Sequence, residues 1–280
     1  MRKINASQIT ELVEKLCIEA NTVLTKDIRD SFALNIKRES SALGREILAT
    51  LTENATIARE ERSPICQDTG MAVVFVTMGQ EVHIEGGYIE DAINQGVRQG
   101  YEKGFLRKSV VKDPLDRENT KDNTPAVVHY EIIPGQVFDI TVAPKGFGSE
   151  NMSQVKMLKP SQGLQGVKDF VLKTVKEAGA NPCPPIIVGV GIGGTMEKSA
   201  ILSKRALLRP VGTSSENAAH AALEAELLEA VNALGIGPAG LGGSTTAMDV
   251  HILTYPTHIA GLPVSVNIGC HATRHAQGSL

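Results

Sequence analysis

Three of the four cysteines lie in segments where a thiolate can bind a metal. Cys66 is followed by polar residues and a glycine, Cys183 stands between prolines, and Cys270 follows a glycine. Each is expected in a loop at the end of a strand or helix, and none belongs to an apolar periodic face. Cys17 differs, because it lies on the apolar stripe of a predicted helix and is expected in the core.

Three such thiolates can meet at one metal centre even though they are far apart in the sequence. A closed zinc site needs a fourth ligand, which His271 or His275 offers. An iron–sulfur cluster held by only three cysteines leaves one iron with an open position, and that iron is a Lewis acid for a hydroxyl or carboxylate. No two cysteines form a C-x-x-C pair, which excludes a zinc ribbon or a thioredoxin-type motif. Three unrelated cysteines are the other alternative.

The run from Ser63 to Gly70 places Gln67 and Asp68 directly after Cys66. It lies between a charged helical region and the first predicted strand, Met71–Met78. A thiol, an amide and a carboxylate at the mouth of a strand are a poor combination for packing in a core. They are a better combination for a loop that offers a thiolate and hydrogen-bonding groups to a ligand.

Two cationic side chains also fall in predicted loops. Arg107 follows a predicted helix, and His258 lies between two predicted strands. Taken singly, their commoner roles are structural: a solvated helix end for Arg107 and a backbone-bonded loop histidine for His258.

A glycine-rich run from Gly189 to Gly194 has the G-x-G-x-x-G spacing of a dinucleotide-binding turn, after a strand and before a helix. The acidic residue at about the expected distance, Glu216, does not end a second predicted strand. A tight strand-to-helix turn is the alternative, so a nucleotide-dependent oxidoreductase rests on this motif alone. A serine hydrolase is unsupported, because the chain has no G-x-S-x-G motif.

The composition is that of an ordinary folded protein, with 280 residues of which 42% are hydrophobic and 21% charged. A net charge of −3, the absence of tryptophan and an aromatic content of 4% argue against a nucleic-acid partner. No apolar run reaches the length of a membrane span, and the N-terminus has no signal-peptide core. A cytoplasmic protein without a membrane partner is expected.

Helical and strand-like periodicities alternate along the chain and predict an α/β (mixed α+β) fold. One hairpin is expected between Ala72–Thr77 and Glu81–Glu85. A second is expected between Ala126–Ile133 and Gln136–Val142, across Pro134-Gly135. With no repeat and no clear linker, residues 1–280 are expected to form a single domain of mixed sheets surrounded by helices.

Further elements follow from the same periodicities. A long functional or surface loop is expected over Leu106–Asn123, where charged residues show weak periodicity. The expected helices are Ser7–Leu24, with Ser7 as N-cap, Ser41–Glu60, Tyr88–Gly104, Gln162–Ala178, Met196–Leu208 and Ser215–Leu234, and the expected further strands are Ile186–Val190, Asp249–Thr254 and Val264–Ile268.

Three cysteine motifs in one order make the chain similar to a known family. Cys66-Gln67-Asp68-Thr69-Gly70, Asn181-Pro182-Cys183-Pro184-Pro185 with the glycine run after it, and Ile268-Gly269-Cys270 resemble motifs of the class I, iron–sulfur-dependent fumarate hydratases. The closer resemblance is to the alpha subunit of the two-subunit form, and it covers nearly all of the chain.

The resemblance implies a [4Fe–4S] cluster with one open iron, held by Cys66, Cys183 and Cys270 in loops at strand ends. It also implies a hydro-lyase reaction, the reversible hydration of fumarate to L-malate. In this family the residues that take the proton from carbon belong to a second domain or beta subunit, and no stretch here resembles that part. A hetero-oligomer is expected, in which this chain is inactive without its partner.

The resemblance also assigns the substrate-binding residues. Gln67 and Asp68 approach the substrate, with Asp68 as the catalytic residue of this chain. Arg107, in a Leu-Arg-x-Ser-Val-Val segment, and His258, in a His-Ile-Ala-Gly-Leu-Pro segment, complete a set that binds a small dicarboxylate. A guanidinium, which can donate to both oxygens of a carboxylate, and a protonated imidazole, which offers a single charge, are suited to that task.

Related enzymes dehydrate L(+)-tartrate, and their alpha subunit is the alternative function. The loops Gly193–Lys198 and Lys145–Asn151 resemble the fumarate version, whereas Phe147 and Ser244 depart from it. A non-catalytic iron–sulfur or zinc-binding subunit is the second alternative, but it would have no need of a dicarboxylate-binding set.

Overall fold

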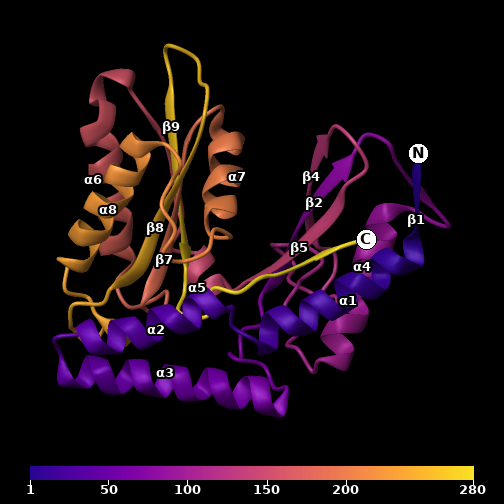
Figure 1. Cartoon of the computed structure of the whole chain (residues 1–280), viewed down its shortest axis with the longest axis horizontal. Coiled ribbons are helices and arrows are strands. Elements are labelled where there is room, and N and C mark those ends of the chain that lie inside the picture. Colours follow the sequence, from indigo (N-terminus) through magenta and orange to yellow (C-terminus); the bar gives the residue numbers. More distant parts are fainter. The chain divides into compact units, whose positions relative to one another are not determined.

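The computed structural model describes residues 1–280, which divide into two compact units (Figure 1). The chain passes from one unit to the other at residues 25/26, 53/54, 147/148 and 273/274, so neither unit is a continuous stretch. Because each unit is assembled from separated stretches, no single linker in the sequence marks the boundary between the units. Unit 1 consists of Met1–Thr25, Asn54–Phe147 and Arg274–Leu280, and unit 2 of Lys26–Glu53 and Gly148–Thr273.

Unit 1 is built on a four-stranded mixed sheet with the order β10-β5-β2-β4. β2 (Met71–Gly79) is mostly buried and has a neighbour on both edges. It runs parallel to β4 (Val127–Ile133) and antiparallel to β5 (Phe138–Lys145). The other edge of β5 is covered by β10 (Ala276–Ser279), which runs antiparallel to it.

Both predicted hairpins are wrong, although their strands are present. β3 (Val82–Glu85) follows β2 closely but pairs in parallel with β1 (Arg2–Asn5) in a separate two-stranded sheet. β4 and β5 are joined by a short turn yet do not pair, because β2 lies between them. The turn closes around the end of β2 instead, where the N–H of Gly79 donates to the carbonyl of Val137 at 2.6 Å. A strand buried on both faces belongs at the centre of a sheet, whichever strands are its neighbours in sequence.

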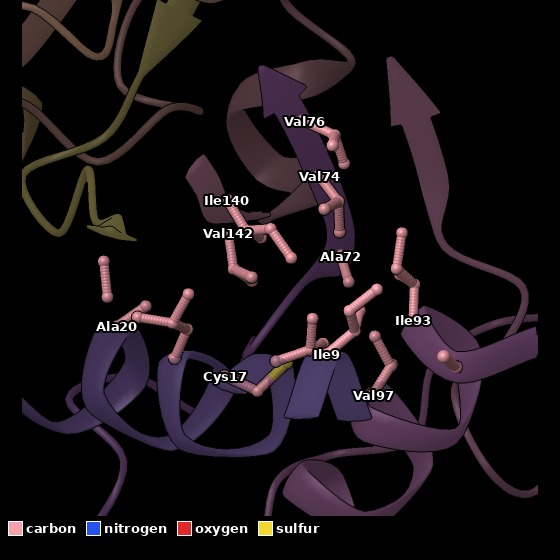
Figure 2. Close-up of a cluster of buried hydrophobic side chains, with 14 of the residues drawn as sticks. Ile9, Cys17, Ala20, Ala72, Val74, Val76, Ile93, Val97, Ile140 and Val142 are labelled. Atoms are coloured by element: carbon pink, nitrogen blue, oxygen red, sulfur yellow. The ribbon is translucent and has the colours of Figure 1, made fainter. Parts of the chain in front are cut away.

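The core of unit 1 lies between this sheet and two helices, α1 (Ala6–Thr22) and α4 (Ile89–Lys103) (Figure 2). Cys17 is part of this core with 0% of its surface exposed, as the sequence predicts. Burial raises the pKa of the Cys17 thiol to about 12. The two helices pack closely because α4 carries glycine at the contact, where a Cβ at Gly96 would lie 2.6 Å from the carbonyl oxygen of Thr10.

The start of α1 differs from the prediction, because Asn5 and not Ser7 is the N-cap. The Asn5 side chain accepts a hydrogen bond from the Ser7 N–H at 2.9 Å, and the Gln8 side chain accepts one from the Asn5 N–H at 3.0 Å. This reciprocal arrangement is a capping box. Serine and asparagine are both good N-caps, so residue type alone does not decide which of two such residues begins the helix.

Unit 2 contains a second mixed sheet, with the order β6-β9-β7-β8. β7 (Ile186–Gly193) runs parallel to β8 (Ala247–Tyr255) and antiparallel to β9 (Leu262–Gly269). β6 (Gln154–Leu158) pairs with the other edge of β9. Because the sheet is mixed, the loops that lead into its strands lie at both of its ends.

Helices cover both faces of the unit 2 sheet. α7 (Met196–Ala206) lies on one face, and α6 (Gly163–Ala178) and α8 (Ala218–Asn232) lie on the other (Figure 1). The predicted helices are all present, and the mixed α/β fold is confirmed. None of the helices combines the length and the apolar character that crossing a membrane requires. The remaining helices are α2 (Lys26–Arg38), which the sequence does not predict, α3 (Ala42–Glu61) and the short α5 (Phe147–Glu150).

The G-x-G-x-x-G run has a packing role. Gly189 and Gly191 lie inside β7 rather than in a turn, and α7 packs directly over them. A Cβ at Gly189 would lie 2.1 Å from the carbonyl oxygen of Ser203, and one at Gly191 would lie 2.0 Å from that of Ser199. Only glycine allows the helix backbone to approach the strand this closely. The dinucleotide-binding alternative thereby loses its one sequence argument.

Candidate active site

In unit 1, the loop from Cys66 to Gly70 leads into β2 and is held by hydrogen bonds to its main chain. The Tyr101 hydroxyl donates to the carbonyls of Thr69 and Gly70 at 2.9 and 3.0 Å. The amide of Asn123 donates to the Gly70 carbonyl at 3.1 Å. Tyr101 and Asn123 are fully buried, and burial raises the pKa of Tyr101, which keeps its hydroxyl a donor. The loop is therefore fixed from the protein interior.

Asp68 is held through both its carboxylate and its carbonyl. The two carboxylate oxygens accept hydrogen bonds from the N–H groups of Gly70 at 3.0 Å and Phe147 at 2.9 Å. The main-chain carbonyl of Asp68 accepts a hydrogen bond from the guanidinium of Arg274. Gly146 makes room for the carboxylate, since a Cβ there would lie 3.0 Å from Asp68 Oδ2. The side chain that the resemblance assigns to catalysis thus has a defined orientation.

Arg107 is joined to this loop through its main chain. The Thr69 hydroxyl donates to the Arg107 carbonyl at 3.2 Å. The Asn123 side-chain oxygen accepts hydrogen bonds from the N–H groups of Ser109 at 2.7 Å and Val110 at 3.2 Å. One buried amide therefore connects the Cys66–Gly70 loop to the Arg107 segment, while the side chain of Arg107 is exposed.

In unit 2, Cys183 and Cys270 lie at the same end of the sheet. Cys183 precedes β7 and Cys270 follows β9, and the antiparallel register aligns Ile187 with Gly269. The N–H of His271 donates to the Cys183 carbonyl at 3.2 Å, which ties the two cysteine segments together. Cys183 is exposed and has a φ of +54°, a left-handed conformation that few non-glycine residues adopt and that is common at functional sites.

His258 lies at the opposite end of the same sheet. It belongs to the connection from β8 to β9, beside the end of β7, where Gly193 is aligned with Tyr255. β7 has 8 residues, which at ~3.3 Å per residue separate its two ends by about 25 Å. The His258 ring accepts a hydrogen bond from the N–H of Ala260 at 3.2 Å. Within unit 2 the structure does not bring His258 together with the two cysteines.

The predicted metal ligands are distributed over both units. Cys66 belongs to unit 1, and Cys183 and Cys270 belong to unit 2. Cys183 is exposed and Cys66 and Cys270 are partly exposed, whereas Cys17 is buried. Cysteine thiolates are the ligands that iron–sulfur clusters use, so the donor set fits such a group chemically. The structure shows no group of three or more His, Cys, Asp or Glu residues placed to hold a single metal ion.

The sequence does not predict the residues that position these groups. Tyr101, Asn123 and Arg274 all donate to main-chain carbonyls of the Cys66–Gly70 loop. Tyr101 looks like an ordinary core residue of a helix, and Asn123 stands in an Asp-Asn-Thr-Pro run typical of loops. The one available signal was the position of Arg274, four residues after Cys270.

Glu39 of unit 2 also holds main-chain segments through hydrogen bonds, and the sequence does not predict this role. Its carboxylate accepts hydrogen bonds from the N–H groups of Ser41 at 2.8 Å, Ser244 at 2.9 Å and Thr245 at 2.7 Å. Burial raises the pKa of Glu39, but these hydrogen bonds to the carboxylate outweigh burial and bring the pKa down to about 2. Ser244 is therefore held through its main chain.

Comparison with known proteins identifies the family. The family described as fumarate hydratase (Fumerase) matches residues 10–279. A protein of Methanocaldococcus jannaschii named "Putative L(+)-tartrate dehydratase subunit alpha" is 43% identical over 275 residues, which cover 96% of each chain. The L(+)-tartrate dehydratase subunit alpha of Escherichia coli K12 is 35% identical over 278 residues, 98% of this chain and 90% of that protein. The resemblance drawn from the three cysteine motifs is confirmed, and the chain belongs to the fumarate hydratase (Fumerase) family of hydro-lyases.

Proposed function

We propose that this chain is the alpha subunit of an iron–sulfur-dependent fumarate hydratase, which interconverts fumarate and L-malate. The observation that carries the proposal is the Cys66–Gly70 loop. It presents a thiol, an amide and a carboxylate in succession, and Asn123 connects it to the segment of Arg107. In the proposed enzyme, this chain provides the cluster ligands and half of the dicarboxylate site.

The cluster ligands in this proposal are Cys66, Cys183 and Cys270. A [4Fe–4S] cluster with three cysteine ligands supplies, when bound, one iron with an open position that acts as a Lewis acid on a hydroxyl or carboxylate oxygen. The hydrogen bond from the His271 N–H to the Cys183 carbonyl keeps two of the three ligand segments adjacent. Ligands that are already adjacent lose less conformational freedom when a metal group binds.

The substrate residues in this proposal are Gln67, Asp68 and Arg107. Arg107 binds a carboxylate of the substrate, because a guanidinium can donate to both oxygens at once. Gln67 offers its amide, and a carboxylate oxygen of Asp68 holds or moves the proton of the reacting hydroxyl or water. The N–H groups of Gly70 and Phe147 keep the Asp68 carboxylate in one orientation, so little freedom is lost when the substrate binds.

His258 is kept in the proposal as a dicarboxylate-binding residue on the family resemblance alone. Its position at the far end of the unit 2 sheet gives that role no support, and its bond with the N–H of Ala260 is that of an ordinary loop histidine.

A partner subunit completes the site in this proposal. Both relatives described above are named as alpha subunits. The proposed active form is therefore a hetero-oligomer with a beta subunit, and that subunit supplies the base that takes the proton from the adjacent carbon. The alpha chain alone is expected to be inactive even when its cluster is loaded.

The test is anaerobic co-expression with the beta subunit, followed by rate measurements on fumarate and L-malate. Turnover is expected for the complex and not for the isolated, cluster-loaded alpha chain. In the complex, Asp68→Asn is expected to lower kcat by about 100-fold or more, because it removes a proton-transfer group. Iron content and visible absorption of the variant should match those of the wild type. Turnover by the alpha chain alone, or full activity of the variant, would contradict the assignments.

The second candidate substrate is L(+)-tartrate, which the names of the relatives favour. The same complex is to be assayed with this diacid under the same conditions. If the complex turns over tartrate but neither fumarate nor L-malate, the proposed substrate is wrong and the proposed reaction class stands. Absence of turnover on all three diacids by a loaded complex would instead support a non-catalytic cluster-binding subunit.

A further inference from the structure

Arg274 of unit 1 is a buried cation with unused hydrogen-bond donors. Only 4% of its surface is exposed. Its Nη2 donates to the main-chain carbonyl of Asp68, whereas Nε and Nη1 are buried and have no partner. A guanidinium stays protonated in proteins, so it cannot avoid the cost of burial by losing its charge. Groups of this kind are normally matched by an acceptor.

The carboxylate of Asp68, whose carbonyl Arg274 contacts, does not neutralise this charge. Both carboxylate oxygens of Asp68 accept hydrogen bonds from main-chain N–H groups, one from Gly70 and one from Phe147. Asp68 offers Arg274 only its carbonyl oxygen. The acceptor for the remaining guanidinium donors must therefore come from elsewhere, and an anion would also balance the charge.

The place of Arg274 in the fold is well defined. It lies two residues before β10, whose first residue, Ala276, is aligned with Val142 of β5. β5 leads in turn to Phe147, the second N–H donor to the Asp68 carboxylate. The same pair of strands thus positions the guanidinium and one of the groups that orient Asp68. Donors that are fixed in advance bind an anion with little loss of freedom.

We propose that Arg274 is a further substrate-binding residue, whose free Nε and Nη1 donors bind a carboxylate of the diacid held at the Asp68 loop. This inference rests on the proposed function and extends it. Unit 1 then supplies two guanidinium groups, Arg107 and Arg274, for a substrate with two carboxylates. Two cations select a dianion over a monoacid of the same length, since the monoacid leaves one of the two cations without its counter-charge.

The test measures binding by calorimetry to the cluster-loaded complex, with succinate as a diacid that has no double bond to hydrate and butyrate as the matched monoacid. The variants are Arg274→Met, which removes the donors, and Arg274→Lys, which keeps a cation able to reach the Asp68 carbonyl. Both are expected to bind succinate at least tenfold more weakly and butyrate less than twofold more weakly than the wild type. Arg107→Met, in the same complex, is the matched comparison and should show the same selectivity.

Other outcomes separate the two proposals. Equal weakening of succinate and butyrate would mean that Arg274 only positions the Asp68 loop, and unchanged succinate binding would mean that it contacts no ligand. If neither Arg274 variant folds, the role of Arg274 is to stabilise the fold. Each of these results overturns the inference alone. A wild-type complex that holds its cluster but binds neither acid would overturn the proposed function, and the inference with it.

Discussion

At the scale of single residues, the candidate site is organised by bonds to the main chain more than by contacts between functional side chains. The sequence marks Cys66 and Asp68 as candidate site residues, because a thiol and a carboxylate at a strand entrance have no use in a core. It could not predict Asn123, since a buried amide that joins two loops leaves no periodicity and no recurring spacing. The same holds for Arg274, whose importance depends on where the last strand of unit 1 places it.

Glu39 makes the stability of the chain sensitive to acid. Its pKa of about 2 in the folded protein lies below the ordinary value of 4.5, so its stabilising effect is present above pH 4.5 and is lost as the pH falls towards 2. Glu39→Gln is expected to lower the free energy of unfolding at neutral pH by about 1–3 kcal/mol. Urea unfolding at several pH values measures this, and the difference from the wild type should shrink below pH 4.5.

The control is Glu46→Gln, which changes an exposed carboxylate on α3 and should leave stability unaltered at every pH. A deficit in Glu39→Gln that stays constant with pH would show that packing, and not the charge of Glu39, accounts for its effect.

At the scale of helices and strands, the sequence predicts what each segment becomes better than it predicts which segments pair. Apolar residues at helical spacing located α1, α3 and α4 because that pattern is local. Pro134-Gly135 showed correctly that the chain turns, but a turn does not oblige the flanking strands to pair. β2 is buried along most of its length and takes the place between β4 and β5. Strand order depends on such burial, which is a property of the whole sheet.

The close contact between β7 and α7 predicts a strong effect of one added methyl group. Gly191→Ala would bring a Cβ to 2.0 Å from the carbonyl oxygen of Ser199, so the helix or the strand must shift. The expected loss is about 3 kcal/mol in the free energy of unfolding, measured by urea denaturation. Gly261→Ala is the matched control, because the nearest atom there is 3.8 Å away. Equal stabilities of the two variants would refute a packing role for Gly191.

At the scale of the whole molecule, the proposed cluster ligands are shared between units that interleave along the chain. The sequence predicts one domain, and it contains no composition shift or linker between the units, because each unit is assembled from separated stretches. The order of the three cysteine motifs nevertheless identified the family. Motif order is a property of the sequence itself and does not require knowledge of how the chain is divided.

Cys183 and Cys17 allow ligand binding and folding to be tested separately. Cys183→Ser is expected to lose most of the cluster iron after anaerobic reconstitution, with a change in unfolding free energy within about 0.5 kcal/mol, because Cys183 is exposed. Cys17→Ser places a hydroxyl in the core and should cost about 1–3 kcal/mol while iron is retained. Iron and sulfide analysis, visible absorption and urea unfolding report the two effects. Full iron content in Cys183→Ser would remove Cys183 from the ligand set.

The pairing of β5 with β10 also has a consequence for synthesis on the ribosome. β5 ends at Lys145, but β10 begins only at Ala276, after every residue of unit 2 has been made. Throughout that interval the outer edge of β5 offers unpaired N–H and C=O groups to the strands of other nascent chains. The four-stranded sheet of unit 1 is thus started before that of unit 2 and completed after it. A chaperone that covers this edge would act on unit 1 while unit 2 is still emerging.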